Sequence, residues 1–343
     1  MKIMKNILLS SYLLFVPAFM QPIINKAIIK TRGNEQVIVL AGDYHKDNPA
    51  NLTQIQDIKN LINSPLKQNL NIIVEDRYPH NSMSYDASRL QNPDLPEWKT
   101  FDRPYVPLVG LTHYCKTQDC SVKNVENRSQ DKIFEIVQYL NQKYVSDPKM
   151  DLPEFEKVIH ENKQNIYTAC LMATLNIKNY QASLQNMETY QGNDLQRKQD
   201  YQAILEYDKQ IIQPYLPLLQ SFPSNVCTSL KNKNLIASYD KICKDTQGLC
   251  VQDGKICLIN IAALQAIADS PTKINLVLMG ASHIHDIDKV TNQMGFKEVF
   301  NSGGPPFPHI HDPIDAFDRY GAHTGNESFF KNLPQLLEHS KSL

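Results

Sequence analysis

The residues best suited to chemistry follow apolar stretches of the chain. His45 and His283 each lie three residues after a glycine that ends such a stretch, and a third stretch ends at Glu75 and Asp76. Two imidazoles and a carboxylate can bind zinc or another divalent first-row metal ion while leaving coordination positions for water and substrate. Without a metal ion, His45 or His283 could act as a general base with Glu75 as its electrostatic partner.

The elements that must position these residues are the strands of a parallel sheet. Three short apolar runs are typical of strands buried on both faces: 36–41, 70–74 and 274–279. Helical spacing at 52–62 separates the first two runs, which gives a strand–helix–strand unit. Because ligands bind at the carboxyl ends of parallel strands, we expect His45, Glu75 and His283 to converge at that edge.

Four further residues are candidate substrate-binding groups. Asp43 and Asp76 adjoin the three predicted ligands, and His113 follows Gly110 with the same spacing as the two principal histidines. The segment 77–103 leaves the sheet beside Glu75 and is rich in Pro and Asn, yet it contains Trp98. A long connection of this kind predicts a lid that turns an aromatic side chain toward the substrate. The alternative is a surface loop whose aromatic residues pack on neighbouring helices.

The predicted fold class is α/β, a mostly parallel sheet flanked by helices, with a large helical insertion. Weaker strand patterns at 105–109, which contains Pro107, and at 296–300 add to the three principal runs. The predicted boundaries are 28–125 and 255–302 for a discontinuous α/β domain, 126–225 for the insertion, and 303–343 for a tail with a short helix near 329–337. Helical spacing with almost no glycine supports the insertion.

The first twenty residues have the pattern of a secretory signal peptide. Lys2 and Lys5 precede a short apolar stretch that is broken by Pro17. We therefore predict a signal peptide at 1–20 and an exported protein, periplasmic or secreted. An uncleaved N-terminal segment, which would be the protein's only membrane contact, is the alternative.

The composition disfavours several classes of partner and mechanism. Lys and Arg total 35 against 36 Asp and Glu, a formal net charge of -1, so the chain lacks the basic excess expected of a nucleic-acid-binding protein. The usual glycine-rich nucleotide loops and the Gly-x-Ser-x-Gly elbow are absent from the sequence. We therefore expect a small-molecule or peptide substrate rather than nucleic acid.

Seven cysteines are consistent with export, because an even subset could pair in an oxidising compartment. Cys115 and Cys120 flank a short polar loop and are the best candidate for a disulfide. Cys243, Cys250 and Cys257 form a second cluster around a glycine-containing turn. The alternative, a nucleophilic cysteine, would require a positioned base.

The two glycine–histidine motifs carry a resemblance to a known superfamily. The segment from Gly42 through His45 to Asn48, the strand that ends at Glu75, and the segment from Met279 to His283 resemble the erythromycin esterase, ChaN-like and TraB/Tiki superfamily. The first motif is most similar to the ChaN-like branch. The resemblance covers about 37–76 and 275–295, and it implies an α/β scaffold with a His/Glu/His site.

The chain differs from this superfamily at two points. The esterase and Tiki branches also use an arginine, and none lies between Gly42 and Arg77 in this chain. Asp43 stands where a Glu or Thr is common. Together with the motifs, the resemblance implies an exported metal-dependent hydrolase of an ester or peptide bond, with a divalent first-row metal ion such as zinc as cofactor. The alternative that it implies is a ChaN-like protein that binds haem or another tetrapyrrole without hydrolysis.

Overall fold

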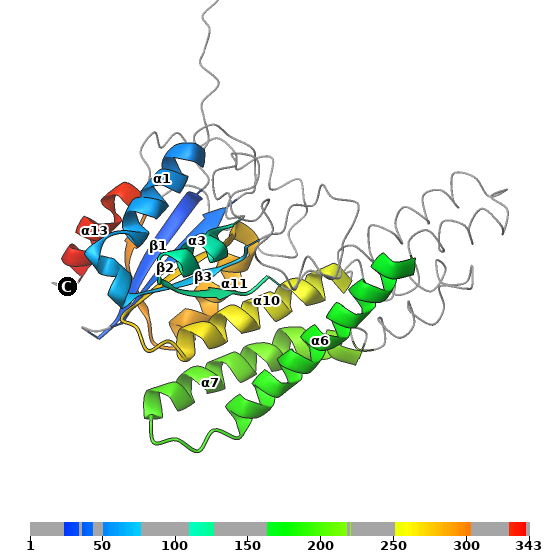
Figure 1. Cartoon of the computed structure of the whole chain (residues 1–343). Helices are drawn as coiled ribbons and strands as arrows, with labels where there is room; N and C mark the ends of the chain where they lie inside the picture. The colour runs from blue at the N-terminus through cyan, green and yellow to red at the C-terminus, as the bar shows by residue number, and fades with distance from the viewer. Residues whose placement is uncertain are drawn as a thin grey trace, which may run out of the picture.

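The structure is a computed structural model, and it describes residues 24–33, 36–43, 51–76, 110–126, 163–217, 220, 251–302 and 329–340 (Figure 1). Its centre is a six-stranded sheet with the order β4-β3-β5-β2-β1-β6. The strands are β1 (Ile24–Arg32), β2 (Gln36–Asp43), β3 (Leu70–Val74), β4 (Ser121–Asn124), β5 (Ile274–Gly280) and β6 (Lys297–Asn301). Strands β2 to β5 run parallel, whereas β1 is antiparallel to both β2 and β6.

Helices cover both faces of this sheet. They are α1 (Asn51–Ile62), α3 (Leu111–Thr117), α6 (Lys163–Glu188), α7 (Leu195–Tyr207), α10 (Val251–Ala268), α11 (Ala281–Gln293) and α13 (Phe329–Ser340). Short helical turns are η1 (Pro65–Asn69), the π-helical η4 (Asp208–Ile212) and η5 (Gln213–Tyr215). Figure 1 shows α1 and α13 on one side of the sheet and α6, α7 and α10 on the other.

The period-two alternation of the strands divides the core into two layers. On β2, Ile38 and Leu40 join the layer formed with α6, α7, α10 and α11, whereas Val39 joins the layer formed with α1, α3 and α13. On β3, Ile73 points to the first layer and Ile72 to the second. Strands that are apolar on both faces are therefore required at the centre of the sheet, as the sequence predicted.

The prediction of an α/β fold with a mostly parallel sheet and flanking helices is confirmed. The runs at 36–41, 70–74 and 274–279 form β2, β3 and β5, and the run at 296–300 corresponds to β6. The sequence reasoning missed β1 and β4, which carry charged and polar residues between their apolar ones. The predicted strand at 105–109 lies outside the described residues.

Two cationic side chains of β1 attach the sheet to its helices. Lys30 is buried, and its ammonium donates to the Asp288 carbonyl of α11 at 2.8 Å and lies 2.5 Å from the Asp288 carboxylate. Arg32 binds the Asp200 carboxylate of α7 with both terminal nitrogens, at 2.5 and 3.0 Å. These contacts fix α7 and α11 against the sheet. In the described part of the chain, no helix has both the length and the apolar character needed to cross a membrane.

Candidate functional site

Three neighbouring parallel strands bring sequence-distant residues together at one edge of the sheet. Strand β5 lies between β2 and β3, and Asp43 at the end of β2 pairs with Gly280 at the end of β5. The Glu75 backbone N–H, just past β3, donates to the Leu278 carbonyl at 3.0 Å. The carboxyl ends of all three strands therefore meet, as the sequence predicted.

Glu75 and His283 face each other at this edge. Both are buried, with 0% and 2% of their surface exposed, and Glu75 Oε2 lies 3.6 Å from His283 Nε2. Helix α11 begins directly after β5, so His283 sits in the first turn above the strand end. The Gly280 backbone N–H donates to Glu75 Oε2 at 2.7 Å, which holds the carboxylate against the start of that helix.

The other ring nitrogen of His283 is bound to Asn260 of α10. His283 Nδ1 lies 2.7 Å from Asn260 Oδ1, and Asn260 Nδ2 donates to the Tyr207 hydroxyl at 2.9 Å. Since the amide nitrogen of Asn260 donates to Tyr207, its oxygen accepts a hydrogen bond from the N–H at His283 Nδ1. In the neutral ring, Nε2 then carries the lone pair that points toward Glu75.

The chain of hydrogen bonds continues to a buried carboxylate. The Tyr207 hydroxyl donates to Asp286 Oδ2 at 3.0 Å, and Asn260 Nδ2 lies 3.5 Å from the same oxygen. Burial raises the pKa of Tyr207 well above its usual value, so the phenol remains a donor. Asp286, Tyr207 and Asn260 thus fix the tautomer and the orientation of His283, an arrangement also found behind metal-binding histidines.

The geometry between Glu75 and His283 calls for a positive charge. A carboxylate oxygen and an unprotonated imidazole nitrogen are both acceptors, so at 3.6 Å they repel unless a proton or a cation lies between them. Two ligands that each bind zinc at about 2.0–2.2 Å lie roughly 3.3–3.6 Å apart at near-tetrahedral angles. The observed separation therefore fits a shared divalent ion, and it also fits an ion pair between an imidazolium and the carboxylate. Among the described residues, no three His, Cys, Asp or Glu side chains form a complete metal cluster.

Asp76 contacts backbone groups rather than the Glu75–His283 pair. Its two carboxylate oxygens accept the backbone N–H groups of Gly110 at 2.9 Å and Thr112 at 2.8 Å, at the start of α3. Gly110 has φ 80°, a left-handed conformation that glycine adopts without a Cβ clash. Burial raises the pKa of Asp76 to about 6, although these hydrogen bonds oppose the shift. In the described structure Asp76 positions α3.

The remaining predicted site residues are placed only in part. Asp43 is buried at 2% exposure beside Gly280. His113 lies in α3, but its side chain falls outside the described part of the structure. His45, Trp98 and the predicted lid at 77–103 also lie outside the described residues.

Sequence reasoning missed the three residues that support His283. Asp286 lies three residues after His283 on α11, a spacing that places the two on the same side of a helix. That spacing is the only local signal. Asn260 and Tyr207 come from α10 and α7, and only the packing of those helices brings them to the histidine.

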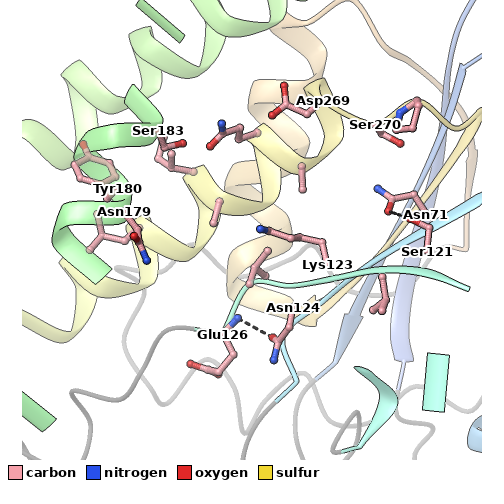
Figure 2. Close-up of a pocket in the computed structure, with 18 residues that line it drawn as sticks. Asn71, Ser121, Lys123, Asn124, Glu126, Asn179, Tyr180, Ser183, Asp269 and Ser270 are labelled. Carbon is pink, nitrogen blue, oxygen red and sulfur yellow. Dashed lines mark hydrogen bonds between the residues drawn. The ribbon is translucent and has the colours of Figure 1, made fainter. Parts of the chain in front are cut away.

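A separate groove lies along the edge strand of the sheet (Figure 2). Its volume is about 550 Å³, and it runs between β4, one face of α10 and part of α6. Ser121, Lys123 and Asn124 line it from β4, and Asn179, Tyr180 and Ser183 line it from α6. None of the predicted site residues lines this groove, so it is distinct from the Glu75–His283 pair.

Comparisons of the chain with protein-family models, with curated proteins and with solved structures found no match.

Proposed function

We propose that this chain is an exported hydrolase that cleaves an ester or peptide bond with a divalent metal ion held by His45, Glu75 and His283. The observation that carries the proposal is the buried Glu75–His283 pair, with Oε2 and Nε2 3.6 Å apart. A divalent cation bound there would lower the pKa of a coordinated water toward neutrality.

The chain's own residues would orient and support the two ligands. The Gly280 N–H fixes Glu75 Oε2, and Asn260 fixes His283 with Nε2 directed at Glu75. Because both ligands are buried, the electrostatic interactions of a bound ion would be stronger than in water. His45 follows Asp43, which ends the strand next to β5, and this position in the chain makes it the third ligand of the proposal.

The proposed helical insertion at 126–225 belongs to the same site. Its helix α7 supplies Tyr207, whose hydroxyl connects Asn260 to Asp286. An insertion that served only as a separate interaction domain would have no reason to contribute to this network. We therefore propose that the insertion stabilises the orientation of His283.

The test is hydrolysis by the purified full chain of two probes, p-nitrophenyl acetate and a mixed library of fluorogenic peptides, before and after chelation. We expect activity that a chelator removes and zinc restores. The substitutions Glu75→Gln and His283→Gln should each lower kcat/KM by about 100-fold or more. A matched control is His285→Gln, a histidine on the same helix that should retain activity within about threefold, since the proposal gives it no role.

Two outcomes would contradict the proposal. If His283→Gln hydrolysed the probes as fast as the parent protein, the opposed pair would have no part in catalysis. If the protein hydrolysed neither probe and instead showed a Soret absorption band after purification, the tetrapyrrole-binding alternative would replace the hydrolase.

A further inference from the structure

Cys115 and Cys120 occupy the two contact positions of a helix C-terminal motif. Helix α3 ends at Thr117, and Asp119 has φ 53°, the left-handed conformation that follows many helix ends. The Cys120 N–H donates to the Cys115 carbonyl at 2.9 Å, and the Asp119 N–H donates to the Lys116 carbonyl at 3.1 Å. This pair of bonds defines the Schellman motif, in which the side chains of the first and last residues commonly pack together.

The side chains at these two positions are both thiols. The two thiols lie in the same buried apolar layer, and no disulfide joins the described cysteines. The Cys120 thiol donates to the Ser121 carbonyl at 3.8 Å. The backbone bonds of the motif bring the two cysteines together at the end of α3.

The two thiols have different surroundings. Cys115 is fully buried, and its hydrogen bond to Cys120 and its burial raise its pKa, with the Asp76 carboxylate adding to the effect. The hydrogen bond from Cys115 lowers the pKa of Cys120, and the Lys67 ammonium favours the same thiolate. Lys67 donates to the Gln118 carbonyl at 2.8 Å, so its charge is held at the end of the motif.

We propose that Cys115 and Cys120 form a reversible redox site in which a disulfide closes the C-terminal turn of α3. The oxidant is a small disulfide such as oxidised glutathione, or a protein disulfide of equivalent chemistry. The Cys120 thiolate attacks one sulfur of that disulfide, and the first thiol leaves with the electron pair of the broken bond. Cys115 then loses its proton and attacks the Cys120 sulfur, which releases the second thiol.

This division of roles follows from the contacts. Cys120 is the thiol that the Lys67 ammonium favours as a thiolate, and it has the greater exposure, 6% against 0% for Cys115. Cys115 is fully buried, and burial and the Asp76 charge both raise its pKa, so it stays protonated until its partner has reacted. A bridge within six residues constrains the unfolded chain less than a long-range bridge does, which suits a site that opens and closes.

The experiment uses the full chain, purified with reductant and then equilibrated in glutathione buffers of increasing oxidising strength. Remaining thiols are blocked with iodoacetamide before trypsin digestion. Cleavage after Lys116 separates the two cysteines, so the disulfide would join a peptide ending at Lys116 to the peptide 117–123. We expect this cross-linked pair to appear with oxidation and to separate on reduction.

Two variants test which cysteines form the cross-link, and a rate measurement tests which sulfur attacks. Cys120→Ser should abolish the cross-link, whereas the matched control Cys257→Ser, which replaces a buried cysteine on α10, should retain it. In the reduced parent protein, iodoacetamide should modify Cys120 at least about tenfold faster than Cys115.

The parent protein alone can refute the proposal. The site is wrong if both cysteines remain fully alkylated in the most oxidising buffer, or if either is cross-linked to another cysteine instead. Faster alkylation of Cys115 than of Cys120 would overturn the assignment of the attacking sulfur.

Discussion

Removal of the buried Tyr207 hydroxyl should show how much the hydrogen-bond network behind His283 contributes to the stability of the fold. In Tyr207→Phe, Asp286 loses a donor at 3.0 Å, and Asn260 Nδ2 loses its partner at 2.9 Å, which leaves it the longer 3.5 Å contact to Asp286. These groups are almost fully buried, at 7%, 0% and 3% exposure for Tyr207, Asn260 and Asp286. An unsatisfied buried group costs about 1–3 kcal/mol, and more when it is charged, so we expect a loss of about 2–3 kcal/mol.

The assay is urea unfolding of the parent protein and the variant followed by circular dichroism. The expected result is a lower midpoint with an unchanged slope, because the same surface is exposed on unfolding. Tyr190→Phe is the matched control. The Tyr190 ring packs edge-on against Tyr201 at 5.3 Å, and its hydroxyl has no hydrogen bond to another described residue.

The control should change the free energy of unfolding by less than about 0.5 kcal/mol. If Tyr207→Phe were equally mild, the network behind His283 would not be the stabilising structure that its distances indicate. If Tyr190→Phe lowered the free energy of unfolding as much as Tyr207→Phe does, the loss could not be assigned to the hydrogen bonds of Tyr207.

Three further predictions concern charged residues elsewhere in the fold. Burial raises the pKa of Asp76 from 3.8 to about 6, so the folded state binds an extra proton between these values and loses stability as pH rises through them. Asp76→Asn should remove about 2 kcal/mol of that pH dependence, as measured by unfolding at pH 4 and pH 7. Lys30→Met leaves the Asp288 carboxylate without its ammonium and should cost about 3 kcal/mol in a urea titration; no change would mean that the ion pair is not stabilising. Arg32→Lys replaces a two-point contact with Asp200 by a point charge and should lower stability by about 1–2 kcal/mol, and an unchanged thermal midpoint would contradict this expectation.

Much of the sheet was predictable because its central strands are buried on both faces. Strands β2, β3 and β5 must be apolar at nearly every position, and such runs are visible in the sequence. Strand β1 was hidden by Lys30 and Arg32, whose charges are satisfied by residues more than 160 positions away. Strand β4 is half exposed at the sheet edge, and four residues with alternating burial give little signal.

The candidate site was predictable only in part, because some of its residues have a local sequence signal and others do not. Glu75 and His283 could be placed together because parallel strands end at one edge, and their residue types suggested a shared function. Asn260 and Tyr207 could not, since no local pattern relates α7 and α10 to the first turn of α11. Asp76 was predicted to bind substrate from its position beside Glu75, and this role stays a prediction; in the structure its carboxylate accepts two backbone N–H groups at the start of α3.

The most direct test of the proposed site is the stoichiometry of bound metal in the full chain purified without added metal or chelator. Elemental analysis, with an absorption spectrum of the same sample, should give about one divalent first-row ion per chain and no Soret band. Glu75→Gln and His283→Gln should each lower that stoichiometry well below one half, while His285→Gln should leave it unchanged. A parent protein without stoichiometric metal, or one whose metal content is the same in all three variants, would contradict the account of Glu75 and His283 as metal ligands.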